Sequence, residues 1–206
     1  MKEADAQHLL PQDFVRRMKF YLTSPQPCPY LTGKMERKVF ANLAVDGAVS
    51  LNDTLTRSGF RRSQTIAYRP ACKACSACRS VRIDVARFDW SRRWRRVEKR
   101  NAMLEREPCR AVASREQFRL LKRYLNFRHP DGGMNEMELR DYAGMVDASP
   151  VQTVVLEYRN RADAGESAPL QAAALTDVLK DGLSMVYSFF RPELSERSVG
   201  AFMVLD

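Results

Sequence analysis

The sequence predicts an α+β protein, in which a small β-rich N-terminal module precedes a second part made of helices and an antiparallel sheet. Residues 170–192 are two apolar runs joined at Lys180-Asp181-Gly182, which is a strong hairpin signal. Residues 114–129 place apolar side chains at helical spacing behind a candidate cap, Ser114. Helices and strands in separate runs, rather than in alternation, are typical of α+β folds.

The first part contains short segments with strand character. Residues 50–60 predict a helix that ends at Gly59, because glycine readily adopts a left-handed C-terminal cap. Residues 80–88 alternate apolar and polar side chains, which predicts a half-buried strand. The other expected strands or turns of this module are residues 11–24, 36–43 and 61–70.

The first part ends with a basic segment, residues 90–107, that we expect to be helical behind Ser91. After the 114–129 helix, HPDGGM must interrupt the helical pattern, and a second helix is expected over 135–149. Residues 151–160 predict a strand, and a further helix begins after Ser198. We place the boundary between the two parts near residue 108, which gives domains of 1–108 and 109–206.

Composition limits the class of protein. The chain has 206 residues, 45% of them hydrophobic, which is enough for a real core. Its 34 Lys and Arg residues against 25 acidic ones give a net charge of +9, and such an excess attracts polyanions such as RNA. No apolar run approaches the length of a membrane span, and the N-terminus is too polar for a signal peptide. We therefore expect a cytoplasmic protein without a membrane partner.

A cysteine cluster is the most distinctive feature. Cys72, Cys75 and Cys78 repeat every three residues after Pro70 and can point at one centre. Cys28, in another proline-flanked loop, is the candidate fourth ligand. Four thiolates suit either a [4Fe–4S] cluster or zinc, and both remain open, as does the alternative of ordinary reduced cysteines.

The basic helix is a candidate RNA-binding element. Trp90, Trp94 and Val97 form an apolar stripe, and the positive charges around it are opposed only by Glu98. A solvated charged face is the alternative, but the near absence of acidic residues favours phosphate contact. The candidate tRNA contacts are Arg92, Arg93, Arg95, Arg96, Lys99 and Arg100.

Several enzyme classes lack support. The chain has no GxxxxGK[ST] loop, so nucleotide hydrolysis and a nucleotide cofactor are not expected. It also lacks a nucleophile elbow and an HExxH pair. Its two histidines are too few for a histidine-rich site, and His129 is better interpreted as closing a helix. Residue patterns alone thus indicate a two-part protein with a metal site at its cysteines and a positive charge that favours RNA binding.

Five longer motifs are distributed over nearly the whole chain. They are FYLTSPQPCPYLTGKMERKVF (20–40), LNDTLTRSGFRRSQTIAYRPACKACSACRSVRI (51–83), RYLNFRHPDGGM (123–134), LTDVLKDGLSMVYSFF (175–190) and RSVGAFMVLD (197–206). In these motifs and in their order, the chain resembles the bacterial aspartate/glutamate leucyltransferases, which are related to the eukaryotic arginyl-tRNA–protein transferases.

This resemblance implies an enzyme that takes leucine from leucyl-tRNA and joins it to the α-amino group of proteins that begin with Asp or Glu. Such a tag marks the acceptor for degradation by the N-end rule pathway. The resemblance also implies an acetyltransferase-like (GNAT-like) second half. Related transferases use N-terminal cysteines for an iron–sulfur centre, which raises that option for the cysteine cluster.

The implied reaction suggests roles for particular residues. Asp177 is a candidate to accept the amine proton or orient the amine, and Tyr187 is a candidate donor to the oxyanion; for both, a structural polar role in the sheet is equally open. An acidic acceptor requires a cation, and arginine binds a carboxylate best. The candidate residues of the acceptor pocket are Tyr30, Arg61, Arg62, Gln64, Tyr68 and Arg69. The alternative is that these arginines are surface residues that bind nothing.

The chain departs from the family pattern at two places. Arg191 stands in FFRP where the family has FFDP, and family members continue beyond the final ValLeuAsp. The nearest rival function is transfer of arginine from arginyl-tRNA. A rival of another class is a non-catalytic, metal-stabilised RNA-binding module.

Overall fold

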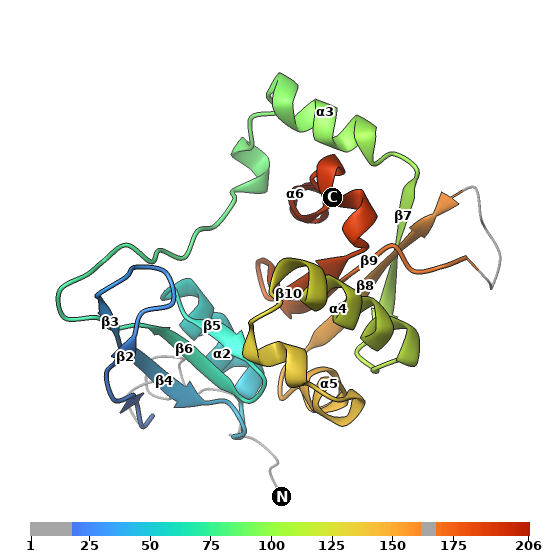
Figure 1. The fold of residues 1–206 in the computed structure, drawn as a ribbon. Helices are drawn as coiled ribbons and strands as arrows, with labels where there is room; N and C mark the ends of the chain where they lie inside the picture. Colours follow the sequence, from blue (N-terminus) through green and yellow to red (C-terminus); the bar gives the residue numbers. More distant parts are fainter. Residues whose placement is uncertain (1–17, 162–167) are drawn as a thin grey trace, which may run out of the picture. The chain divides into compact units, whose positions relative to one another are not determined.

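The computed structural model describes residues 18–161 and 168–206, which divide into two compact units between Arg82 and Ile83 (Figure 1). The expected boundary near residue 108 falls instead within the strand β7 (Leu104–Arg110). This strand pairs along its whole length with β8 (Thr153–Asn160). The basic helix and β7 therefore belong with the second unit, because backbone pairing outweighs the change in composition at residue 108.

The first unit is built on an antiparallel sheet of strand order β1-β4-β6-β5. The helix α2 (Ala48–Arg57) packs against one face, where Leu51 and Leu55 join Ala41 and Ala67 in a buried core. A separate short hairpin precedes the sheet strand β4. The strands are β1 (Tyr21–Leu22), β2 (Gln26–Pro27), β3 (Met35–Glu36), β4 (Lys38–Asn42), β5 (Arg61–Ser63) and β6 (Ile66–Pro70).

Most expectations for this unit are confirmed. Residues 36–43 and 61–70 contain strands. The helix α2 ends at Arg57 with Ser58 as its cap, and Gly59 follows with a φ of 82°. That positive φ explains the glycine, since it has no Cβ to clash. Of the segment 11–24, β1 confirms a strand at 21–22, while residues 11–17 lie outside the described residues.

The strand expected over residues 80–88 is wrong. Val81 and Val85 are 86% and 87% exposed, and no described strand pairs with this segment. The Asp84 carboxylate instead accepts a hydrogen bond from the Ala86 N–H at 3.1 Å and starts the short helix η1 (Val85–Arg87). Alternation predicts a strand only where a neighbouring strand and an apolar surface can receive it.

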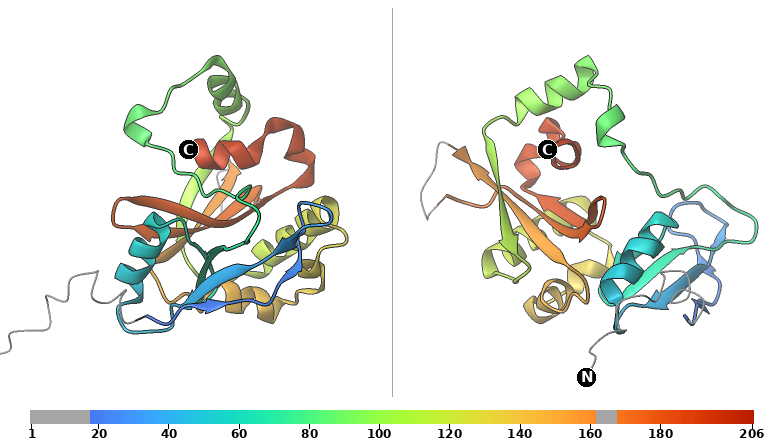
Figure 2. Two further views of the ribbon diagram at one scale, coloured as in Figure 1. Left: turned by 90° about the vertical axis from the view of Figure 1, so that its left-hand side faces the viewer. Right: turned by 180° about the vertical axis from the view of Figure 1, so that it is seen from behind.

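The second unit is an antiparallel sheet of order β10-β9-β8-β7 with helices on both faces (Figure 2). The central hairpin is β9 (Ala172–Leu179) and β10 (Gly182–Phe190), joined where the sequence predicted. One face packs against α4 (Arg115–Arg128) and α5 (Leu139–Val146). The other packs against α3 (Arg92–Arg100) and α6 (Val199–Leu205). The α+β prediction is confirmed.

Specific side chains set the limits of these helices. Ser114 and Gln117 form a reciprocal capping box at the start of α4, as the sequence predicted. The helix α3 ends at Asn101, whose side-chain amide donates to the carbonyls of Val97 (2.8 Å) and Arg197 (2.9 Å). The expected helix over 90–107 is therefore shorter, because Asn101 diverts the chain into β7.

The segment after α4 is also more broken than expected. Residues 135–149 were expected to form one helix, but η2 (Gly133–Glu136) precedes α5. The N–H of Glu138 donates to the Asp141 carboxylate at 2.8 Å, so α5 starts only after Glu138. At the C-terminal end, the short helix η4 (Pro192–Arg197) leads into α6, which confirms a helix after Ser198.

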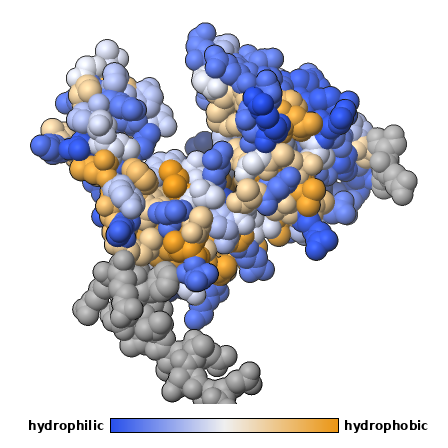
Figure 3. All heavy atoms as spheres, turned by 90° about the horizontal axis from the view of Figure 1, so that it is seen from below, coloured by the Kyte–Doolittle hydropathy of each residue, from blue (hydrophilic) through white to orange (hydrophobic). Residues whose placement is uncertain are grey.

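The surface mixes hydrophilic and hydrophobic residues. On the face drawn in Figure 3, hydrophobic residues form small patches separated by hydrophilic ones. Within the part of the chain that the structure describes, no helix combines the length and the apolar character needed to cross a bilayer.

Candidate functional site

A buried carboxylate, Asp177, lies near the end of β9 in the second unit. Its exposed fraction is 0%. Cross-strand register places Asp177 opposite Thr153 on β8 and opposite Ser184 on β10. The Thr153 hydroxyl donates a hydrogen bond of 2.8 Å to Asp177 Oδ1. A buried carboxylate requires such donors, because an unpaired charge in an apolar environment is very costly.

The second candidate, Tyr187 on β10, shares a sheet face with Asp177. Tyr187 pairs with Leu175, two residues before Asp177 on the same strand, and residues two apart on a strand point to one face. Burial raises the pKa of the Tyr187 hydroxyl above its ordinary value of 10, and the nearby Tyr124 raises it further. The phenol therefore keeps its proton at neutral pH and can donate a hydrogen bond.

Tyr124 lies near Tyr187 and had no assigned role in the sequence prediction, whereas His129, which contacts Tyr124, was expected to close a helix. Tyr124, from α4, packs its ring 5.1 Å from Phe190 and 6.2 Å from His129. His129 ends α4, with its N–H bonded to the Leu125 carbonyl at 2.8 Å, so the expectation that it closes a helix is confirmed. The only sequence signal for Tyr124 was its place in the RYLNFRHPDGGM stretch.

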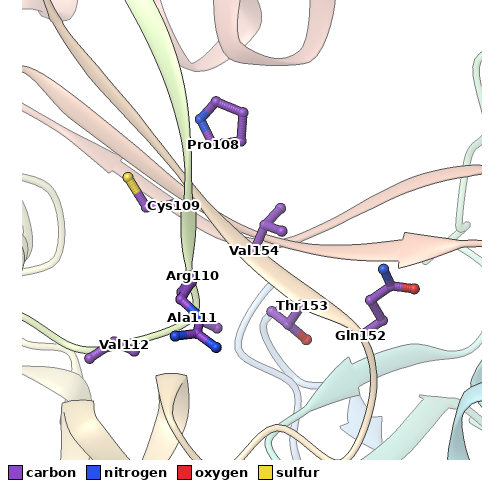
Figure 4. Close-up of a pocket in the computed structure, with 8 residues that line it drawn as sticks. All are labelled: Pro108, Cys109, Arg110, Ala111, Val112, Gln152, Thr153 and Val154. Atoms are coloured by element: carbon purple, nitrogen blue, oxygen red, sulfur yellow. The ribbon is translucent and has the colours of Figure 1, made fainter.

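An open hollow of about 560 Å³ lies where β7 and β8 begin to separate (Figure 4). Thr153, the hydrogen-bond partner of Asp177, is part of its wall. The lining residues come from the end of β7, the start of β8 and the positions next to them, and they include both polar and apolar side chains. The lining residues are Pro108, Cys109, Arg110, Ala111, Val112, Gln152, Thr153 and Val154.

The predicted acceptor residues belong to the first unit, but strand register divides them between two faces. Arg61 pairs with Tyr68, which places both on the face away from α2. Arg62 pairs with Ala67 and is buried on the opposite, helix-covered face, where its guanidinium donates to the Gln64 carbonyl at 2.9 Å. The structure therefore brings together Arg61 and Tyr68, but not Arg61 and Arg62.

The remaining acceptor candidates have separate surroundings. Arg69 donates to the Ser58 carbonyl at 3.1 Å and lies over the Phe60 ring at 5.0 Å, so it braces the end of α2. Gln64 has a φ of 51° in the β5–β6 turn and shapes the backbone there. Tyr30 is 78% exposed on the loop between β2 and β3.

The aromatic residues on the Arg61 face of the first unit's sheet, away from α2, form a row that sequence reasoning missed. Tyr21, Phe40 and Tyr68 are directly opposite one another on β1, β4 and β6. The Tyr21 and Phe40 rings stack 5.5 Å apart, and Lys38 Nζ lies 5.9 Å from the centre of the Tyr68 ring. With Arg61 at the end of the row, this face offers flat apolar rings beside positive charge.

Two of the predicted ligands, Cys28 and Cys72, lie close to one hairpin of the first unit. The N–H of Cys28 bonds to the Lys34 carbonyl at 2.9 Å across the β2–β3 hairpin, and Cys72 Sγ lies 3.8 Å from the Arg37 carbonyl just beyond it. Cys28, Cys72 and Cys75 are half-buried and Cys78 is exposed. Four thiols are a donor set that suits zinc or an iron–sulfur cluster.

No three ligand-type side chains within residues 18–161 and 168–206 are gathered as a metal-binding group. The metal site at Cys28, Cys72, Cys75 and Cys78 stays a prediction.

The basic helix α3 presents its positive charges to solvent. Its six predicted contacts, Arg92, Arg93, Arg95, Arg96, Lys99 and Arg100, are all exposed, whereas Val97 is buried and Trp94 packs against the core. At about 100° per residue, the six cations fall within an arc of about 160° opposite Trp94. The helix thus has one apolar face held by the sheet and one continuous cationic face.

Arg191 has a structural role. Its side chain donates to the Leu170 carbonyl at 2.9 Å and its N–H donates to the Gln171 carbonyl at 2.8 Å. These bonds tie the end of β10 to the segment that leads into β9. The Arg191 guanidinium, which stands where the family pattern has an aspartate, is therefore hydrogen-bonded to a backbone carbonyl.

Comparison with known proteins defines the class. The family described as "Arginine-tRNA-protein transferase, N terminus" matches residues 26–96, and its counterpart described as "C terminus" matches residues 116–206. Together they cover most of the chain. A basic α+β protein with these two regions is an aminoacyl-tRNA–protein transferase, an enzyme that acts on tRNA and on protein.

The chain belongs to the aspartate/glutamate leucyltransferase family. It is 54% identical over 206 residues to the enzyme of this name from Hyphomonas neptunium, and covers 81% of that protein. It is 56% identical over 189 residues to that of Afipia carboxidovorans, where the match spans 91% of this chain and 75% of the relative. The Phenylobacterium zucineum enzyme is 53% identical over 191 residues, which are 93% of this chain and 74% of that one. The family prediction is confirmed.

Proposed function

We propose that this enzyme transfers leucine from leucyl-tRNA to the α-amino group of proteins that begin with Asp or Glu, which marks them for the N-end rule pathway. The names of the relatives support the leucyl donor and the acidic acceptor. The observation that carries the mechanism is the fully buried carboxylate of Asp177 on the same sheet face as Tyr187.

The chemistry requires little activation. Aminoacyl-tRNA is already a reactive ester, so the enzyme must hold a neutral amine against the carbonyl carbon and stabilise the oxyanion that forms. An α-amine with a pKa of about 8 needs only a modest base. Asp177 receives the proton, and Tyr187, whose pKa is raised, donates to the oxyanion. No covalent enzyme intermediate is needed.

Acceptor recognition is assigned to the first unit. Arg61 binds the acidic side chain, because it is exposed, whereas Arg62 is buried and Arg69 bonds to Ser58. Tyr68, opposite Arg61 in the sheet, supports the same face. A planar guanidinium can bind a carboxylate through two hydrogen bonds, which selects Asp or Glu over neutral residues.

The tRNA contact is assigned to the cationic face of α3 in the second unit. Its six exposed cations offer charge to phosphates along one side of the helix.

When a metal or cluster is bound by Cys28, Cys72, Cys75 and Cys78, it cross-links the loops of the first unit and so stabilises a small core.

A direct transfer assay tests this proposal. Purified protein is incubated with an Asp-initiated peptide and with radiolabelled leucyl-tRNA or arginyl-tRNA in parallel, and with a matched Asn-initiated peptide as control. We expect label from leucyl-tRNA on the Asp peptide and much less on the Asn peptide. Transfer of arginine instead would assign the rival donor named in the family descriptions, and transfer of neither would favour a non-catalytic RNA-binding module.

A further inference from the structure

Two hydroxyl groups connect the buried Asp177 carboxylate with the surface of the second unit. Thr153 Oγ1 lies 2.8 Å from Asp177 Oδ1, and Ser149 Oγ lies 2.6 Å from Thr153 Oγ1. Both hydroxyl oxygens also lie 3.2 Å from the Val151 carbonyl, which is an alternative acceptor for each hydroxyl proton. Asp177 is fully buried, whereas Ser149 is partly exposed.

The hydrogen bond from Thr153 to Asp177 gives this chain a direction. The Thr153 hydroxyl has one proton, and it donates that proton to Asp177 Oδ1. The Thr153 oxygen then has only lone pairs to offer, and Ser149 donates to it. The outer oxygen, on Ser149, accepts a long hydrogen bond of 3.4 Å from the Val151 N–H, and its second lone pair can accept a proton from a group outside the chain.

The position of the chain suits a reacting amine. Thr153 is part of the wall of the 560 Å³ hollow, beside Gln152 (Figure 4). Ser149 is not one of the lining residues, but it is partly exposed and lies 2.6 Å from Thr153 Oγ1, at the edge of the hollow. A substrate amine at this edge cannot touch the buried Asp177 carboxylate directly, because Asp177 has no exposed surface. Proton transfer to a buried base therefore needs an intermediate group, and hydroxyls can both accept and donate.

We infer that Ser149 and Thr153 relay the amine proton to Asp177 during aminoacyl transfer, an inference that rests on the proposed function. The amine nitrogen bonds to the ester carbonyl carbon and gives one proton to Ser149. Ser149 passes its own proton to Thr153, and Thr153 passes its proton to Asp177. The ester C–O bond then breaks, and the proton returns by the same path to the departing ribose oxygen. Asp177 finishes ionised.

Isosteric substitution tests the relay. Thr153→Val removes the hydroxyl with little change of volume, and we expect kcat to fall about 100-fold with KM within about twofold, as for loss of acid–base catalysis. Thr153→Ser keeps the hydroxyl and recovers most of the loss. Ser149→Ala lowers kcat about 10-fold, in the range expected when an outer step is bypassed by water. Thermal melting checks that each variant folds, and Ser149→Ala carries the test alone if Thr153→Val does not fold.

A double-mutant cycle separates a relay from a packing role. If Thr153 acts through Asp177, adding Thr153→Val to Asp177→Asn lowers kcat no further. The matched control is Thr176→Val, which removes a buried hydroxyl from the opposite sheet face, where Thr176 bonds to its own strand. That variant keeps its kcat.

Several results would overturn the relay. They are an unchanged kcat in Thr153→Val or in Ser149→Ala, equal losses in Thr153→Val and Thr153→Ser, and additive losses in the double variant. Failure of the wild-type enzyme to transfer any amino acid would instead reject the proposed function, and the relay with it. The two failures are therefore distinguishable.

Discussion

The cationic face of α3 leads to a quantitative prediction about tRNA affinity. Arg92, Arg96 and Lys99 lie within an arc of about 60° at the centre of that face. Arg93 is less suitable as a test, because its guanidinium lies 4.8 Å from the Trp94 ring and is partly committed to it. We therefore choose the triple variant Arg92→Gln/Arg96→Gln/Lys99→Gln, which removes the central charges and spares the apolar stripe.

The magnitude follows from the number of phosphate contacts removed. A solvent-exposed pair of opposite charges at about 4 Å is worth about 1 kcal/mol. Three such contacts amount to about 3 kcal/mol, or about a 100-fold rise in the Kd for tRNA. Each lost phosphate contact also lowers the slope of log Kd against log salt by about 0.7 to 0.9, so the triple variant loses about 2 to 3.

The measurement is a salt titration of tRNA binding by fluorescence anisotropy. A matched control is Arg115→Gln/Arg119→Gln/Arg140→Gln, which removes the same charge from exposed positions on α4 and α5. The control slope stays close to that of the wild type. Equal losses in both triple variants would show that only net charge matters, and an unchanged slope in the α3 variant would remove this helix from the tRNA interface.

Two further predictions concern metal and pH. Cys75→Ser removes one of four expected ligands, so metal content per chain falls and the first unit loses protection from proteolysis; unchanged metal content in the variant contradicts the site. Arg159 holds the pKa of the Glu116 carboxyl below its ordinary value of 4.5. The folded-state pKa is thus below the unfolded one, and the stabilisation is present at neutral pH and is lost as the pH falls below about 4.5 through the folded-state pKa. Denaturant unfolding from pH 6 to 3 checks this, and Glu116→Gln flattens the curve; parallel curves for both proteins refute it.

Much of the fold was predictable because its signals are local. The turn at Lys180-Asp181 and the capping box at Ser114 depend on residues a few positions apart, and both occur where expected. The segment 80–88 has an equally good local pattern but no strand beside it. Local periodicity cannot show whether a partner strand exists, and here that was decisive.

The candidate site divides in the same way. Asp177 was singled out from its place on a hairpin strand, but its link to Thr153 depends on the register between β8 and β9, which joins residues 24 positions apart. Arg61 and Arg62 look alike in the sequence, yet strand pairing sends one to the open face and buries the other.

By itself, the sequence determined the α+β class, the cationic helix and the family, because these depend on composition, on short-range spacing and on long matching motifs. Only the tertiary structure decided which polar groups meet. Hydrogen bonds between distant side chains, such as the buried Gln117 amide with Glu157 at 2.7 Å, require a sheet register and a helix position that no local pattern encodes.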